Sequence, residues 1–135
     1  AMGNLSITEA RDVRSALANY DKALELCPEM SAAWIRKGVT LMNDGQLSEA
    51  DICFNTAVKL RPADFKPYYN RGKLRLQKND VDGAIADFDK ATTYNPDHAG
   101  AHELFGDALL RDGKEDLAAL HWRLAEEIKK KKKKK

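Results

Sequence analysis

The stretch that decides the fold is residues 31–64, which read SAAWIRKGVTLMNDGQLSEADICFNTAVKLRPAD. Residues 65–98 and 99–132 repeat its pattern with the same 34-residue step. Six columns of prolines, glycines, alanines and large rings share this period. Their members are Pro28, Pro62 and Pro96; Gly38, Gly72 and Gly106; Ala16, Ala50, Ala84 and Ala118; Ala23, Ala57, Ala91 and Ala125; Tyr20, Phe54, Phe88 and Trp122; and Trp34, Tyr68 and His102. Such a period is the signature of a repeat architecture.

Within one repeat the spacing predicts two helices joined by a turn. Ala50, Phe54 and Ala57 lie at steps of four and three, so they share one face of a helix. Small residues on both sides of a large ring let a second helix approach and seat the ring. A glycine inside a helix costs about 1 kcal/mol relative to alanine, so its recurrence indicates close helix packing. Gly45 and Gly113 are predicted turn residues, and each repeat proline ends a second helix.

This pattern resembles the tetratricopeptide repeat over about residues 12–128. The residues that carry the resemblance are Trp34, Gly38, Leu41, Ala50, Phe54, Ala57 and Pro62, together with their 34-residue shifts. The family pattern has leucine before the glycine and an aromatic residue three positions after it. The first slot is filled here by Lys37, Arg71 and Phe105, and the second by Leu41, Arg75 and Leu109.

The resemblance implies an all-α fold, a right-handed α-solenoid of antiparallel helix pairs in 34-residue repeats. We expect a domain over residues 4–128, with a lone helix at about 8–27 and repeats at about 31–61, 65–95 and 99–130. Residues 1–3 are interpreted as an expression scar, and residues 129–135 as a solvated poly-lysine tail. The unpaired first helix suggests a piece of a longer array.

Composition restricts the class of protein. The formal net charge is +2, but removal of the seven lysines at 129–135 leaves 16 basic against 21 acidic residues, a net charge of −5. An acidic body argues against nucleic-acid binding by the folded domain. No apolar run is long enough for a membrane span, and no signal peptide opens the chain. Cys27 and Cys53 are predicted buried thiols, which favours a cytoplasmic location.

The resemblance also implies where a partner binds, because the first helix of each pair lines the concave groove in which peptides lie. The candidate groove residues fall outside the repeat signature. They are Ile35, Arg36, Val39, Met42 and Asn43; Lys66, Tyr69, Asn70, Lys73 and Gln77; and Glu103, Asp107 and Arg111, with Ala32, Leu76, Gly100, Leu104 and Leu110 beside them. The basic members are expected to hold carboxylates, Tyr69 and Met42 to contact apolar side chains, and Asn70 to bond peptide backbone. Glu103 and Asp107 favour a basic segment.

Some members of this family grip the C-terminal carboxylates of heat-shock chaperones with two basic groups, two asparagines and an arginine spread over three repeats. Asn70 fits that clamp. Ile35, Val39, Gly100 and Leu104 stand where the other groups are needed. The clamp is also incomplete when it is shifted by one repeat, so chaperone-tail binding is not predicted.

Two further surfaces give alternative functions. The last predicted helix carries an apolar stripe with no capping helix after it, at Leu117, Leu120, Leu124 and Ile128. This stripe is a candidate edge for self-association into a homo-oligomer. The lysines at 129–135 are a candidate contact with anionic surfaces.

Catalysis is not predicted. His98 and His102 are four residues apart, but the first follows Pro96 in a turn and the second occupies a ring slot of the repeat, so we predict no metal site. His121 is interpreted as a packing or surface residue. No phosphate-binding loop or nucleophile motif is present, and no cofactor is expected. The predicted function is a protein–protein interaction scaffold or adaptor that binds a partner peptide in the groove.

Overall fold

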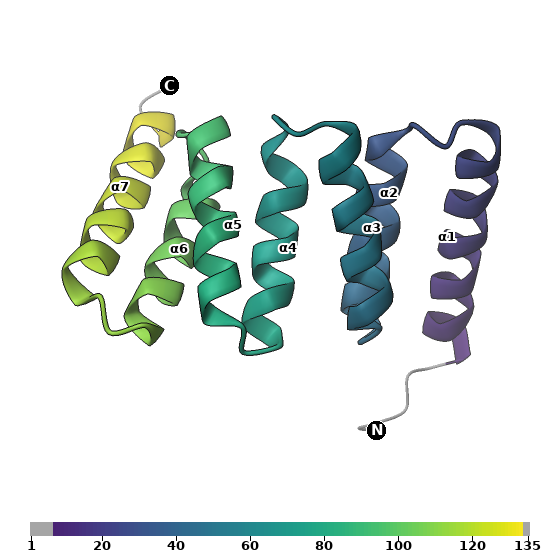
Figure 1. The fold of residues 1–135 in the computed structure, drawn as a ribbon, viewed down its shortest axis with the longest axis horizontal. Coiled ribbons are helices and arrows are strands. Elements are labelled where there is room, and N and C mark those ends of the chain that lie inside the picture. Colours follow the sequence, from purple (N-terminus) through teal and green to yellow (C-terminus); the bar gives the residue numbers. More distant parts are fainter. Residues whose placement is uncertain (1–6, 134–135) are drawn as a thin grey trace. The chain divides into compact units, whose positions relative to one another are not determined.

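The computed structural model describes residues 7–133, and their secondary structure is entirely helical (Figure 1). The helices are α1 (Ile7–Leu26), α2 (Ser31–Asn43), α3 (Leu47–Leu60), α4 (Phe65–Gln77), α5 (Val81–Tyr94), α6 (Ala99–Arg111) and α7 (Glu115–Lys133). Three of the links are three-residue turns, which pair α2 with α3, α4 with α5, and α6 with α7. The predicted scar at residues 1–3 lies outside the described residues.

The helices belong to two compact units, one ending at Pro62 and the other beginning at Ala63. In the first unit, α1 and α3 both pack against α2. In the second unit, α5 packs against α4 and α6, α7 packs against α6, and α4 also contacts α6. The second unit therefore contains two complete helix pairs, and the candidate site is built from it.

Each helix pair turns at a residue with positive φ: Gly45 at 83°, Asn79 at 62° and Gly113 at 80°. In the first pair, the amide of Gly45 donates to the carbonyl of Met42 at 3.0 Å, and that of Gln46 to Leu41 at 2.9 Å. The other two turns repeat both bonds, which together make a Schellman cap. The middle turn uses asparagine, which tolerates this conformation better than other non-glycine residues.

The repeat glycines lie against the large rings of the second helices. A methyl group added at Gly72 would stand 2.7 Å from Cε1 of Phe88. One added at Gly38 would stand 2.6 Å from Cε1 of Phe54. Both phenylalanines are completely buried. These contacts confirm that the recurring glycine marks close helix packing.

The ring column is tied to the turn before it. The indole N–H of Trp34 donates to the carbonyl of Pro28 at 2.8 Å, and Nε2 of His102 lies 2.8 Å from the carbonyl oxygen of Pro96. Because a carbonyl oxygen only accepts, Nε2 of His102 carries the hydrogen. Histidine fills this slot because it supplies the same kind of donor.

The lysine run differs from the expected tail. Helix α7 continues to Lys133, so Lys129–Lys133 are helical and exposed. Lysine is a good helix former, and cations at a helix C-terminus interact favourably with the helix dipole. Lys129 also forms an ion pair with Glu103 of α6. Lys134 and Lys135 lie outside the described residues.

Candidate functional site

The predicted groove residues of the first unit are only partly accessible. Ile35 and Met42 are buried, Val39 is half-buried, and Arg36 and Asn43 are exposed. The side chains of Ile35 and Met42 are thus enclosed by the fold, and their contact with a partner stays a prediction. In this unit, Arg36 and Asn43 are the exposed members of the predicted set.

The groove residues of the second unit form what we call the α4–α6 face. Its half-buried members are Tyr69, Asn70, Lys73 and Glu103, and its exposed members are Lys66, Gln77, Asp107 and Arg111. The two helices are in contact, and Arg111 of α6 donates to the carbonyl of Leu76 on α4 at 3.4 Å. The eight side chains therefore come from two adjacent helices of one unit.

Tyr69 lies at the centre of this face. The ammonium of Lys73, one turn later on α4, lies 4.8 Å from the centroid of the Tyr69 ring. His98, the N-cap of α6, meets the same ring edge-on with a centroid distance of 4.7 Å and lies 5.0 Å from the ring of Phe65. Gly100 leaves room for the tyrosine, since a methyl group there would stand 3.1 Å from the hydroxyl. Sequence reasoning missed Phe65 and His98 as neighbours of Tyr69.

Burial changes how these groups titrate. Partial burial lowers the pKa of Lys73. Burial, together with the negative charge of Glu103, raises the pKa of Tyr69. Burial lowers the pKa of His98, and Lys132, His102 and Lys73 lower it further. At neutral pH the face therefore presents a phenol, a neutral imidazole and an ammonium from which water is partly excluded.

The acidic end of the face is engaged with α7. Glu103 pairs with Lys129, and Asp107 accepts a hydrogen bond from the indole N–H of Trp122 at 3.1 Å. Asn70 is engaged within its own helix, α4, where its side-chain amide nitrogen donates to the carbonyl of Lys66 at 3.0 Å. These bonds position the three side chains and reduce their capacity for a new partner.

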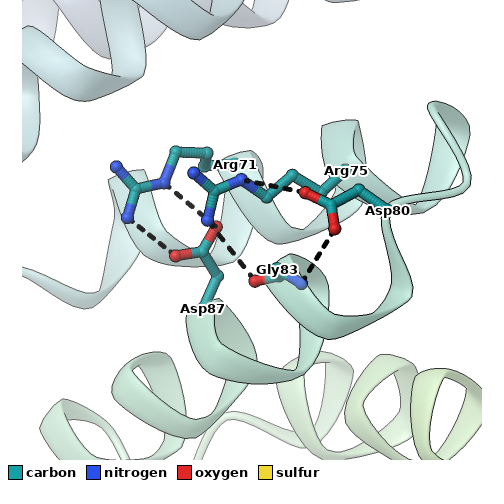
Figure 2. Close-up of polar contacts among 5 residues, drawn as sticks. All are labelled: Arg71, Arg75, Asp80, Gly83 and Asp87. Carbon is teal, nitrogen blue, oxygen red and sulfur yellow. Dashed lines mark hydrogen bonds and ion pairs between the residues drawn. The ribbon is translucent and has the colours of Figure 1, made fainter. Parts of the chain in front are cut away.

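A buried ion cluster lies between α4 and α5 (Figure 2). The carboxylate of Asp87, only 3% exposed, accepts two bonds from Arg71 at 2.8 and 3.0 Å and one from Arg75 at 3.0 Å. Arg75 also reaches the carbonyl of Gly83, whose amide donates to Asp80, the N-cap of α5. The signal for this cluster was present in the sequence, because arginine replaces the family's leucine and aromatic residue in this repeat only.

A second, partly buried contact joins His102 of α6 to His121 of α7. Their Nδ1 atoms are 3.0 Å apart, and the ring of His121 stacks on Phe105 at 4.2 Å. Because Nε2 of His102 donates to Pro96, its Nδ1 in the neutral ring accepts from Nδ1–H of His121. Both histidines therefore pack, as the sequence indicated, but they pack as one hydrogen-bonded pair.

Two histidines whose pKa values are lowered in the folded chain, His98 and His121, make stability depend on pH. Burial and the neighbouring His102 lower the pKa of His121 from 6.5, against the opposing charge of Asp89. The unfolded chain then binds more protons than the folded chain just below pH 6.5. We expect full stability above pH 6.5 and a decline as pH falls from there toward the folded pKa. Urea unfolding from pH 7.5 to 5.5 measures this, and H98N/H121Q should flatten the profile. An equally steep decline in that variant would contradict the assignment.

Of the two cysteines, only Cys53 is buried as the sequence predicted. Cys53 is buried, and burial raises its pKa. Cys27 is half-buried and donates from Sγ to Glu29 at 3.4 Å. Across the described residues, no group of three or more histidine, cysteine, aspartate or glutamate side chains is arranged to hold a metal ion. No helix in the same part of the chain is long and apolar enough to cross a membrane.

The candidate edge on α7 divides into two parts. Leu117 and Leu120 are 48% and 43% exposed. Leu124 and Ile128 are half-buried and line a cavity of about 230 Å³ together with His102. The exposed part of the predicted edge is therefore the N-terminal half of α7.

Comparison with known proteins places this geometry in a family. Models described as tetratricopeptide repeat match residues 31–64 and 69–130. Protein FlbA of Caulobacter vibrioides is 32% identical over 86 residues, which cover 64% of this chain and 14% of that protein. Human tetratricopeptide repeat protein 7A is 28% identical over 95 residues, covering 70% of this chain and 11% of that protein. The chain thus spans a small part of these relatives.

Solved structures extend the likeness to the fold. A MamA RS-1 double mutant superimposes over 93% of this chain and 71% of its own, with a TM-score of 0.81 and 25% identity. MamA from Desulfovibrio magneticus also superimposes over 93% of this chain and 71% of its own, with a TM-score of 0.79 and 26% identity. This chain therefore belongs to the tetratricopeptide repeat family and has its all-α helical-repeat solenoid fold, the architecture of a protein–protein interaction module.

Proposed function

We propose that this chain binds a peptide segment of a partner protein on the α4–α6 face, as a scaffold or adaptor without catalytic activity. The observation that carries the proposal is the aromatic cluster of Phe65, Tyr69 and His98, which joins α4 to the start of α6 and stays half-exposed. The repeat signature requires none of these residues, although His98 also caps α6 and Tyr69 also packs against the core cluster around Phe88. Tyrosine at such a position offers a large rigid contact at low entropic cost.

Peptide binding of this kind predicts a dissociation constant near the micromolar range, about −8 kcal/mol. We expect random peptides selected on the immobilised protein to bind the wild type and to bind Tyr69→Ala at least tenfold more weakly, because the variant removes the centre of the cluster. Fluorescence anisotropy measures both constants.

Tyr94→Ala is the matched control for that experiment. Tyr94 is an exposed tyrosine on the second helix of its pair, so its loss should leave affinity within about twofold. Circular dichroism establishes that both variants are folded. Equal affinity of wild type and Tyr69→Ala for the selected peptides would contradict binding on this face.

Self-association is a second candidate, favoured by the exposure of Leu117 and Leu120 on α7. Apolar side chains so exposed on one helix are typical of an interface. A light-scattering mass that stays at the monomer value over a wide concentration range would contradict it. Contact of the lysine run with anionic surfaces, the absence of nucleic-acid binding by the folded body and a cytoplasmic location stay predictions.

A further inference from the structure

Lys73 differs from every other partly buried cation in the described chain. Four lysine and arginine side chains in residues 7–133 are half-buried: Lys37, Arg71, Lys73 and Arg75. Lys37 pairs with Asp21 at 2.7 Å, and both arginines pair with Asp87. Within the same residues, no carboxylate lies within ion-pair distance of Lys73, whose contact is the face of the Tyr69 ring. The Lys73 side chain is partly shielded from water and has no anion beside it, so a carboxylate placed there by a partner would be a favourable neighbour.

Two more donors beside Lys73 lack an acceptor in the described part of the molecule. The Tyr69 hydroxyl points toward Gly100 and forms no hydrogen bond there. His98 accepts the amide N–H of Ala101 on Nδ1 at 3.0 Å, so in the neutral ring Nε2 carries the hydrogen, and it too has no acceptor. Lys73, Tyr69 and His98 therefore gather three kinds of donor around one ring, and none of the three donors is paired with an acceptor in residues 7–133.

Such a cluster is complementary to an acceptor that carries negative charge. Hydrogen bonds from an ammonium and a phenol to a carboxylate are charge-assisted and stronger than neutral ones. Glu103, whose charge adds to the effect of burial in raising the pKa of Tyr69, is held by Lys129 and does not reach Lys73. Its nearby charge also disfavours a dianion such as a phosphate, because Lys73 is the cation at the centre of the cluster.

We infer that Lys73 and Tyr69 form a subsite for a single carboxylate of the bound peptide, with His98 completing its edge. The inference rests on the proposed function and names the chemistry of the segment that the α4–α6 face takes. The carboxylate comes from an aspartate or glutamate side chain or from the free C-terminus of the peptide, and the site recognises the group in either setting.

The test uses the peptides selected on the wild-type protein, each made in three forms. One form is unchanged, one carries Gln or Asn in place of its acidic residues, and one ends in a C-terminal amide. We expect the wild type to lose at least tenfold in affinity for one of the two neutralised forms, and which form it is identifies the source of the carboxylate. Lys73→Met should bind the unchanged and neutralised forms equally well, since the interaction is then already absent.

Matched variants make the result specific to the subsite. Tyr69→Phe removes only the hydroxyl and should lose part of the preference for the carboxylate. Lys73→Arg retains the positive charge and should keep most of the preference for the carboxylate. Lys90→Met removes an exposed lysine from α5, outside the α4–α6 face, and should leave the preference unchanged.

The outcomes separate this inference from the proposed function. A wild type that binds the charged and both neutralised forms alike overturns the subsite and leaves peptide binding intact. A preference for the carboxylate that survives in Lys73→Met also overturns it. A wild type that selects no peptide overturns the proposed function, and the subsite falls with it.

Discussion

Replacing Asp87 with alanine is expected to lower the free energy of unfolding by about 3 kcal/mol, at the lower end of the range for breaking a buried ion pair. The carboxylate is almost fully enclosed and accepts three hydrogen bonds, two from Arg71 and one from Arg75. Its removal leaves two guanidinium groups at a half-buried site without their anion. Urea denaturation of both proteins at pH 7.5 measures the difference.

Two variants make this prediction specific. Asp82→Ala removes an exposed carboxylate from the first turn of α5 and should cost less than about 1 kcal/mol, through the helix dipole. Joint replacement of Arg71, Arg75 and Asp87 by leucine should recover most of the loss, because apolar packing often replaces a buried ion cluster without penalty. The next repeat already has Phe105 and Leu109 in the two arginine slots. A cost below 1 kcal/mol for Asp87→Ala would show that both guanidinium groups reach water.

Truncation of Phe88 to alanine is expected to cost about 3–5 kcal/mol, the usual range for a buried aromatic residue. Phe88 is completely buried and lies in a core cluster with Ala84, Phe105 and Leu109. The ring also lies directly on Gly72. Its loss therefore opens a cavity where Gly72 of α4 meets α5. The free energy of unfolding from urea titration gives the value.

The contact with Gly72 adds a test that Phe88→Ala alone does not provide. Gly72→Ala in the wild type should destabilise, although alanine is the better helix former, because its methyl group would stand 2.7 Å from the ring. In the Phe88→Ala background the same change should be neutral or stabilising. The double-mutant cycle then gives a coupling free energy of about 1 kcal/mol or more. Additive effects would show that the ring moves aside at no cost.

Much of the fold was predictable because its contacts are local and repeat every 34 residues. The glycine and ring columns predicted which helices approach each other, and the structure places Gly38 on Phe54 and Gly72 on Phe88. The positive-φ turn at Asn79 was not predicted, since the pattern there lacks a glycine. The helical lysines at Lys129–Lys133 were also missed, because a run of like charge is typical of a solvated tail and not of a helix end.

The candidate site was less predictable. Helical positions identified Tyr69 and Lys73 as groove residues, and both lie half-buried on the α4–α6 face. Helical positions did not reveal that Ile35 and Met42 are enclosed. Nor did they reveal that α7 engages Glu103 and Asp107. Each of these outcomes depends on a side chain from another helix, which no period within a single helix can indicate.

By itself the sequence determined the repeat, the helix pairing and the helices from which a binding face is built. A period of small and large residues specifies which helices approach closely, because a large ring packs where the facing helix has a glycine. Only the tertiary structure decided which polar groups find partners. Asp87 pairs with two arginines and His102 bonds to His121, whereas Lys73 has no carboxylate within ion-pair distance in residues 7–133. The physical reason is that pairing depends on burial and on reach between helices, and both exist only once the chain is folded.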